Sequence, residues 1–356
     1  MEVPISDMLK KLDTVTRGYI SVIEDTADEL SEDLYLVGGP VRDLILGRDS
    51  IDLDIAVRGD GIKFADLLAD RIKGSTLTVY KERLTAVVAV PGQRHIDVAT
   101  MRTEVYDRPG ALPRVEAAPD IRRDLARRDF TINAMALKLD GSDLTELVDP
   151  FNGRRDIVSS VVRSLHPKSF VDDPTRIYRA IRFEVRLGFQ IEAQTLKTLR
   201  DAVSDSALKT ISGQRRIKEI NLYLAEVSPF MFIKRAYDLG ALADIVPDRT
   251  TLEDIERRYE KIMSTKSLTP ENRRLLLLAA LFVHGTQDEA SNQVGYFGMT
   301  KELRTTIIDT MMLLDAVSSD PSPSSISSVM RRYTDRSRLL AYIITNSDLL
   351  LPYISL

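Results

Sequence analysis

The chain has 356 residues and a formal net charge of −4; 44% of its residues are hydrophobic and 29% are charged. These values are typical of a soluble protein with about two or three domains. The lack of cysteine excludes disulfides, thiolate catalysis and cysteine-based zinc sites. No apolar run approaches the roughly 20 residues that span a bilayer, and no signal peptide is recognised, so a cytoplasmic protein without a membrane partner is expected.

The first part of the chain is predicted to mix strands with helices. Apolar positions at helical spacing favour a helix over residues 5–31. A polar, proline-containing loop is expected at 106–115. Further helices are expected at 40–46 and 62–73, and strands at 34–38, 51–57, 75–80, 84–90 and 94–100, of which 75–80 and 84–90 form a hairpin.

From about residue 153 the apolar pattern becomes helical. Helices are expected at 174–187, 193–203, 213–226, 229–239, 252–263, 271–284 and 300–317. The predicted fold class is therefore α+β, a mixed-sheet head followed by an all-α neck, body and tail. We place the head at 1–150, the neck at 151–235 and the body and tail at 236–356. The neck holds 16 basic and 9 acidic residues, which suits phosphate contacts or, alternatively, an ordinary solvated helical surface.

The most informative pattern lies between residues 34 and 54. A buried strand ends in Gly38-Gly39, a short helix begins at Pro40, and the next strand carries Asp52 and Asp54. Because strand side chains alternate, both carboxylates point to one face, where they repel each other unless a cation lies between them. Carboxylates together with substrate phosphates suit Mg²⁺. The pattern predicts metal-assisted nucleotidyl transfer; the alternative is two exposed carboxylates on an edge strand.

Asp97 is a candidate third carboxylate of this site. It lies in the middle of the strand predicted at 94–100 and faces opposite to its apolar neighbours. If this strand lies beside the strand of Asp52 and Asp54, Asp97 can act as a metal ligand or as the base for an attacking hydroxyl. A simple ion pair of Asp97 with Arg94 or Arg102 is an equal alternative.

Two further segments combine arginines with acids. In Arg127-Arg128-Asp129, the arginines match phosphate geometry and Asp129 can hold Arg128, although a solvated helix start capped by Asp129 explains the pattern equally well. Asp172-Asp173-Pro174 opens a helix whose arginines recur every three residues and share one side: Arg176, Arg179 and Arg182.

An Asp173/Arg176 pair at the top of this helix can contact a base edge. The carboxylate accepts from an exocyclic amine and the guanidinium donates to a ring acceptor, so the pair suits both cytosine and adenine. The alternative is pairing within the helix to Glu184 and neighbouring acids. Further on, Ser212 is expected to cap a helix in which Arg215 and Glu219 are spaced for a supporting ion pair.

Taken together, these segments resemble the class II tRNA nucleotidyltransferase family, which contains CCA-adding, CC-adding and A-adding enzymes and bacterial poly(A) polymerases. The resemblance covers roughly residues 33–226. Where the family has Glu-Asp-x-x-Arg, this chain has Asp172 in place of the leading Glu. The motifs that carry the resemblance are Gly38-Gly39-Pro-Val-Arg42-Asp43 with Asp52-Leu-Asp54, Arg127-Arg128-Asp129-Phe-Thr-Ile-Asn133, Asp149-Pro-Phe-Asn-Gly153 with Asp156 and Arg163, Asp172-Asp173-Pro-Thr-Arg176, and Arg215-x-x-x-Glu219.

The resemblance implies a polymerase-β-like nucleotidyltransferase head and a defined set of site residues. Asp52 and Asp54 are implied as metal ligands, and Gly39 and Arg42 at the incoming triphosphate. The residues implied to line the nucleotide pocket are Arg128, Asp173, Arg176, Arg179 and Arg182. The tail beyond about residue 240 is implied to position tRNA; no protein partner is implied.

The expected reaction is template-independent addition of C and/or A to the 3′ end of tRNA from CTP and ATP. Two Mg²⁺ ions, about 3.5–4 Å apart in such sites, would serve the attacking hydroxyl and the triphosphate. In this family an intact loop, here 103–120, goes with addition of the terminal A. The alternatives are CC addition, a poly(A) polymerase, a small-molecule nucleotidyltransferase, or an RNA-binding protein with an idle head.

Overall fold

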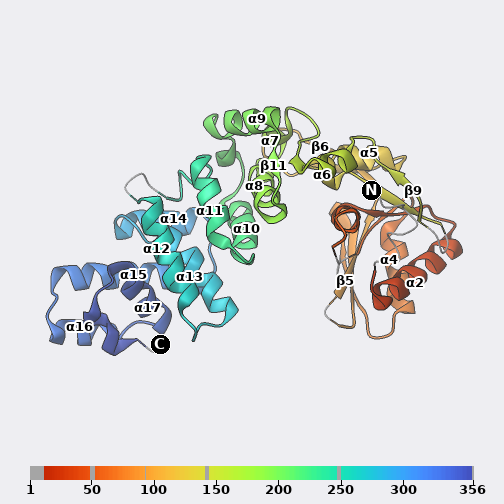
Figure 1. Ribbon diagram of the computed structural model, residues 1–356. Helices are drawn as coiled ribbons and strands as arrows, with labels where there is room; N and C mark the ends of the chain where they lie inside the picture. Colours follow the sequence, from red (N-terminus) through yellow and green to blue (C-terminus); the bar gives the residue numbers. More distant parts are fainter. Residues whose placement is uncertain (1–11, 49–52, 93, 141–143, 247–249, 355–356) are drawn as a thin grey trace. The chain divides into compact units, whose positions relative to one another are not determined.

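The computed structural model describes residues 12–48, 53–92, 94–140, 144–246 and 250–354. The chain divides into two compact units, each described by itself below (Figure 1). The head unit contains residues 1–173 and 187–198, and the helical unit contains residues 174–186 and 199–356. The division into head, neck, and body with tail stays a prediction.

The head unit is built on a seven-stranded mixed sheet, as predicted. The strand order is β3-β4-β5-β2-β1-β8-β9, and every neighbouring pair is antiparallel except β2 and β5, which are parallel. The strands are β1 (Leu34–Val37), β2 (Leu53–Val57), β3 (Thr76–Tyr80), β4 (Thr85–Val90), β5 (Arg94–Thr100), β8 (Ala136–Leu139) and β9 (Leu144–Val148). The hairpin of β3 and β4 is confirmed, whereas β8 and β9 were not located from the sequence.

Two helices cover one face of this sheet. Helix α2 (Thr14–Leu30) is capped by Asp13, whose side chain accepts from the backbone N–H groups of Val15 and Thr16. Helix α4 (Gly61–Arg71) packs on strands β2 to β5 and against α2, and Figure 1 shows the two helices side by side. The expected helix at 5–31 is thus confirmed from Thr14 onward; residues 5–11 lie outside the described part of the chain.

The opposite face of the sheet is covered by segments that follow β5. These are the hairpin of β6 (Arg102–Val105) and β7 (Arg114–Ala117), then α5 (Ile121–Ala126) and the 3₁₀ turn η3 (Thr131–Asn133). Ala56 of β2 packs in one apolar cluster with Ile121 and Leu125 of α5. Since side chains alternate along a strand, Asp54 shares this face with Ala56.

The segment expected to be a loop is therefore partly a hairpin. Residues 102–105 pair with 114–117, and only 106–113 connect them irregularly. Beyond β9, the head unit continues with short elements: α6 (Gly153–Val158), β10 (Val161–Val162), α7 (Ser169–Asp172) and β11 (Gln190–Ile191).

Several helices of the helical unit begin directly after a serine or threonine that caps them. Thr251, Thr269, Thr286, Thr300, Ser322 and Thr334 each cap a helix through their hydroxyl. Helix α13 (Pro270–Phe282) is central, because its residues 276–282 are all buried. No helix within the described residues is long and apolar enough to span a bilayer.

Most helices of this unit were predicted, α17 as a short helical tail containing Arg336 and Arg338, and α14 and α16 were added by the structure. Residues 193–198 of α9 belong to the head unit. From α8 onward the helices are α8 (Thr175–Leu187), α9 (Ala193–Ser204), α10 (Gly213–Leu224), α11 (Pro229–Asp238), α12 (Leu252–Ser264), α13 (Pro270–Phe282), α14 (Gln287–Tyr296), α15 (Lys301–Ser319), α16 (Pro323–Met330) and α17 (Asp335–Thr345).

Candidate active site

The Gly-Gly turn brings two of the predicted site residues together. Gly38, between β1 and α3 (Gly39–Ile45), has a φ of 73°, and its N–H donates to the carbonyl of Met135 over 3.2 Å. A Cβ at this position would lie 2.7 Å from Nη1 of Arg128 and 3.6 Å from Oδ2 of Asp54. Glycine is favoured by the backbone conformation, and any side chain at this position would displace the guanidinium of Arg128.

Arg42 lies on the same turn and is held from two sides. Its Nε and Nη2 both donate to the carboxylate of Asp43 over 2.9 Å, and its Nη1 donates to Oδ1 of Asn133 over 2.6 Å. The amide of Asn133 in turn donates to Oδ1 of Asp129 over 3.2 Å. A Cβ on Gly39 would lie 3.7 Å from Nη2 of Arg42. The guanidinium is thus buried and oriented beside the turn.

The carboxylates of the site come from two adjacent strands. Asp54 of β2 and Asp97 of β5 are direct partners in the parallel register. Strands in a sheet lie about 4.8 Å apart, and parallel partners point to the same face, so the two carboxylates are neighbours. Asp97 is 44% exposed, and its Oδ2 lies 3.6 Å from Nε2 of His95. Asp52 lies outside the described residues.

This donor set fits a divalent metal. Adjacent carboxylates repel each other without a cation, and hard oxygen ligands suit Mg²⁺. Among the described residues, no group of three potential metal-binding side chains occurs, so the pair of Asp54 and Asp97 needs a further ligand. Asp52 is the candidate that the sequence provides, two residues before Asp54.

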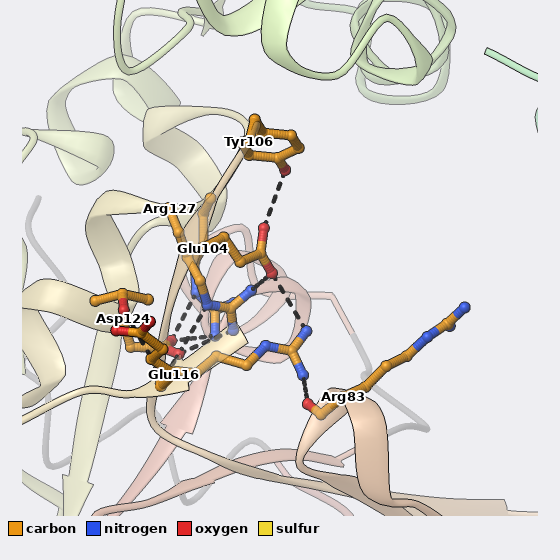
Figure 2. A network of polar contacts seen from close by, with 9 residues as sticks. Arg83, Glu104, Tyr106, Glu116, Asp124 and Arg127 are labelled. Atoms are coloured by element: carbon orange, nitrogen blue, oxygen red, sulfur yellow. Dashed lines mark hydrogen bonds and ion pairs between the residues drawn. The ribbon is translucent and has the colours of Figure 1, made fainter. Parts of the chain in front are cut away.

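A buried carboxylate that sequence reasoning passed over organises the arginine motif (Figure 2). Oδ1 of Asp124 accepts from Arg127 Nη2 over 2.8 Å, and Oδ2 accepts from Arg128 Nη2 over 3.0 Å. Oδ1 also accepts from the backbone N–H of Arg102 over 3.1 Å. Burial alone would raise the pKa of Asp124, but the charges of Arg128 and Arg127 outweigh burial and hold that pKa below its ordinary value.

Arg127 and Arg128 consequently point in different directions from one anchor. Arg128 reaches Gly38, while Arg127 Nη1 donates to Oε1 of Glu104 on strand β6 over 2.9 Å. Figure 2 shows the hydroxyl of Tyr106 donating to the other oxygen of Glu104, over 3.0 Å. The hairpin is thereby tied to the arginine motif. The i,i+3 and i,i+4 spacing of Asp124 to Arg127 and Arg128 is the sequence signal that could have identified this anchor.

The remaining head motifs are structural. Asp149 accepts from the N–H groups of Gly153 over 2.7 Å and Arg154 over 2.9 Å, which caps α6. Asp156 of α6 accepts from the hydroxyl of Thr131 over 2.7 Å and from Nε of Arg163 over 3.0 Å. These bonds fix the segment that carries Arg128.

The predicted base-contacting residues occupy both units. Asp173 follows α7 in the head unit, and its N–H donates to the carbonyl of Ser169 over 3.2 Å. The carbonyl of Asp172 accepts from the N–H of Gly110, at the tip of the β6–β7 hairpin, over 3.2 Å. The three arginines lie on α8 in the helical unit.

The three arginines of α8 are partly or fully buried. Arg176 is only 5% exposed. The guanidinium carbons of Arg179 and Arg182 each lie 5.6 Å from the ring centre of Phe183. Nη1 of Arg182 lies 3.9 Å from Oε2 of Glu219, on α10. Glu184, the partner considered from the sequence, binds Arg235 of α11 with both oxygens, over 2.6 and 3.1 Å.

Sequence reasoning also missed Arg216, which is fully buried. Its Nε donates to the hydroxyl of Tyr178 over 3.2 Å and its Nη1 donates to Asp244 over 2.8 Å. Burial alone would lower the pKa of Arg216, but Tyr178 and Asp244 keep the guanidinium charged. The partners of Arg216 are distant in sequence, so no local sequence pattern predicts its burial.

Comparisons with known proteins bear out the predicted resemblance. Residues 34–163 match the family model of the poly A polymerase head domain. The A-adding tRNA nucleotidyltransferase of Geobacter sulfurreducens is 43% identical over 235 residues, which are 65% of this chain and 26% of that protein. The A-adding tRNA nucleotidyltransferase of Halalkalibacterium halodurans is 35% identical over 231 residues, 64% of this chain and 54% of that protein. The chain thus matches about a quarter to a half of the length of these relatives.

Solved structures confirm the fold along almost the whole chain. A CCA-adding enzyme in complex with ATP matches with a TM-score of 0.78 at 28% identity, covering 99% of this chain and 85% of that chain. The Thermotoga maritima CCA-adding enzyme complexed with tRNA-CCA matches with a TM-score of 0.74 at 28% identity over the same shares of the two chains. The predicted α+β class, a nucleotidyltransferase head followed by helices, is therefore correct.

Proposed function

We propose that the chain, whose residues 34–163 match the poly A polymerase head-domain model, is a nucleotidyltransferase that adds C and/or A nucleotides to the 3′ end of tRNA. The donors are CTP and ATP, and no template is used. The similarity to A-adding and CCA-adding enzymes supports this substrate class. A tRNA substrate also favours the cytoplasm as the location.

The observation that carries the proposal is the convergence at the Gly-Gly turn. Arg128 Nη1 and Asp54 Oδ2 lie 2.7 and 3.6 Å from the position that a Cβ would take on Gly38, so both groups face this turn. A guanidinium binds phosphate oxygens, and a carboxylate beside it holds a metal that neutralises the same phosphates. This combination suits a nucleoside triphosphate better than an uncharged ligand.

The nucleotidyltransferases that this chain resembles depend on a metal, and we propose Mg²⁺, held by Asp52 and Asp54. When bound, it lowers the pKa of the attacking hydroxyl and stabilises the charge of the triphosphate. Asp97, beside Asp54, acts either as a further ligand or as the acceptor of the hydroxyl proton.

The remaining site residues bind and orient the nucleotide. Arg128 contacts the triphosphate at the Gly-Gly turn, and Gly39 and Arg42 complete that end of the site. The 3′-oxygen of the RNA then attacks the α-phosphorus, and pyrophosphate leaves. For the choice of base we propose Asp173 and Arg176, with Arg179 and Arg182 lining the nucleotide pocket.

Addition of the terminal A is favoured over CC addition. In the family resembled here an intact loop accompanies A addition, and in this chain that loop forms the β6–β7 hairpin, anchored through Glu104 and through Gly110. Poly(A) polymerase is the second candidate, since the matched head model carries that name.

One assay tests the proposal and separates the candidates. Three transcripts are incubated with Mg²⁺ and labelled CTP or ATP: a tRNA that lacks CCA, a tRNA that lacks only the terminal A, and an RNA without tRNA shape. CCA addition extends the first, A addition extends only the second, and poly(A) synthesis extends the third. Absence of pyrophosphate release with all three refutes the proposed reaction and favours an RNA-binding role.

A further inference from the structure

One face of the head sheet is exposed over strands β3 and β4. Helix α4 packs on β2 to β5 from the other side, where Val88 and Val98 are buried. Because side chains alternate along a strand, the residues between these buried positions point to the opposite face. On that face β3 exposes Thr76, Thr78 and Tyr80, and Tyr80 is 47% exposed.

The segments that follow β5 cover a different part of this face. Val37 of β1, Ala56 of β2, Ala136 of β8 and Val148 of β9 form one apolar cluster with residues of α5. The cover thus lies over β1, β2, β8 and β9. We call the uncovered face of β3 and β4 the open strip; its residues are Thr76, Thr78, Tyr80, Thr85, Val87 and Ala89.

The open strip is continuous with the candidate metal site. Asp54 of β2 pairs with Asp97 of β5 in the register of the sheet. On its other side Asp97 pairs with Val87 of β4, and Val87 pairs with Thr78 of β3. At about 4.8 Å per strand, this row of side chains extends about 14 Å from Asp54. A ligand bound on the strip can therefore reach both carboxylates.

The chemistry requires the two substrates to approach Asp54 from different sides. In the sheet, β2 lies between β1 and β5. The Gly-Gly turn follows β1 and is approached by Arg128, so the proposed triphosphate site lies on the β1 side. In an in-line displacement the attacking oxygen and the leaving pyrophosphate are on opposite sides of the α-phosphorus. The 3′-oxygen of the RNA therefore comes from the β5 side, which is the side of the open strip.

The side chains of the open strip suit the bases and riboses of single-stranded RNA. All six are uncharged, and the threonine hydroxyls can exchange hydrogen bonds with 2′-hydroxyl groups. Tyr80, at the end of β3, offers a ring on which a base can stack.

The turn directly after Tyr80 offers contacts to phosphates. This turn, η2 (Lys81–Arg83), exposes two cations, with the exposed acid Glu82 between them. The carbonyl of Arg83 accepts from Arg102, and Figure 2 shows the side chain of Arg83 extending away from that polar network. An aromatic ring and cations thus lie next to each other at the end of the strip.

We propose that the open strip binds the 3′-terminal nucleotides of the RNA substrate, with an upstream base stacked on Tyr80 and the terminal hydroxyl directed towards Asp97 and Asp54. The inference rests on the proposed function and adds the site of its second substrate. Stacking accepts every base, so the strip can hold an RNA end whose last nucleotide changes with each addition.

The first test is Tyr80→Ala, with Tyr80→Phe as its matched control. Loss of the ring should raise KM for a tRNA that lacks CCA by about 5- to 150-fold, the effect of one lost base stack. KM for CTP and ATP should change by less than about twofold, and Tyr80→Phe, which keeps the ring, should resemble the wild type. An unchanged KM for tRNA in folded Tyr80→Ala, or an equal rise in KM for tRNA and for nucleotide, would overturn the proposal.

A charge placed on the strip is a second, independent test. Thr78→Glu puts a carboxylate on the exposed face of an edge strand, where it repels RNA phosphates and disturbs no buried group. The dissociation constant for tRNA, measured without Mg²⁺ and nucleotide, should rise by at least about tenfold.

The matched control is Thr14→Glu. It places the same charge at an exposed position at the start of α2, on the helix-covered side of the sheet, and should leave tRNA binding unchanged. Equal tRNA affinities in Thr78→Glu and Thr14→Glu would refute the strip as the RNA site.

The activity of the wild type separates this inference from the proposed function. If the wild type extends tRNA and both Tyr80→Ala and Thr78→Glu do so with unchanged KM, only the open strip is refuted. If the folded wild type extends no RNA, the proposed function is overturned and this inference with it.

Discussion

Arg128 approaches Gly38 so closely that a side chain at position 38 would displace its guanidinium. A Cβ there would lie 2.7 Å from Nη1 of Arg128, and the φ of 73° is itself unfavourable for residues with a side chain. The arginine is in turn held by Asp124, which is 1% exposed. The Gly-Gly turn and the arginine motif therefore form one structure, although they are 90 residues apart in sequence.

Gly38→Ala should consequently lose activity out of proportion to stability. We expect nucleotide incorporation to fall by at least about a hundredfold, because a displacement of about 1 Å at a reacting group has that effect. The matched control is Gly188→Ala, which shares a φ of 71° but has nothing within 4 Å of the added Cβ. It should lose about 1 kcal/mol of unfolding free energy and keep full activity. Equal activities in the two variants would disprove a role for the close approach.

Asp54→Asn should abolish pyrophosphate release and leave the fold intact. The side chain lies at the surface of the site, where an amide fits the same volume but binds a divalent metal poorly. Incorporation should fall by at least about a hundredfold at saturating Mg²⁺. Asp33→Asn is the control, since Asp33 pairs with Arg58 at an exposed position. Retained activity in Asp54→Asn, with circular dichroism unchanged, would refute the metal site.

Asp97→Asn distinguishes the two roles proposed for this carboxylate. If Asp97 is a metal ligand, the variant needs a higher Mg²⁺ concentration for half-maximal rate, and excess Mg²⁺ restores kcat. If Asp97 accepts the hydroxyl proton, kcat stays low by about 10²–10⁴-fold at every Mg²⁺ concentration. A variant with wild-type kcat and wild-type Mg²⁺ dependence shows that Asp97 is a bystander.

Glu24 gives the head an unusual dependence on pH. Burial, followed by repulsion from Asp140, Asp25 and Asp28, raises its pKa from 4.5 to about 7. Between these two values the folded state binds more protons than the unfolded state, so stability falls as pH rises from about 4.5 to 7. Glu24→Gln should remove this slope and raise Tm at pH 8 relative to wild type, with little change at pH 4.5. Parallel Tm–pH curves for the two proteins would contradict the shifted pKa.

The sequence predicted the Gly-Gly turn well because its signals are local. A strand, a glycine pair and a helix start lie within a dozen residues, and each follows from the chemistry of its own side chains. Strand β8 was not predicted, since Ala136-Leu-Lys-Leu139 contains good helix formers. It is a strand because Leu36 of β1 pairs with Leu137, a contact that no local pattern contains.

The site residues that the sequence did not identify depend on distant partners. Arg216 was given no role from the sequence, and it is buried where its guanidinium binds Tyr178 and Asp244, 38 and 28 residues away. Asp124 differs, since its arginine partners are three and four residues away and their spacing was visible. The sequence did not predict that the carboxylate of Asp124 is buried, and this burial determines how strongly it orients both arginines.

Arg176→Lys tests base selection in the helical unit. Arginine offers a planar fork of donors, whereas lysine offers a single ammonium, so the variant keeps the charge and loses the bidentate contact to a base edge. We expect the preference between CTP and ATP to relax by about 5- to 150-fold, equivalent to about 1–3 kcal/mol. The control is Arg186→Lys on the same helix, where the side chain is 45% exposed and its nearest acid is Glu226, 3.9 Å away. Competition between labelled CTP and ATP on a tRNA lacking CCA measures the preference directly, and an Arg176→Lys protein with wild-type selectivity would remove Arg176 from base selection.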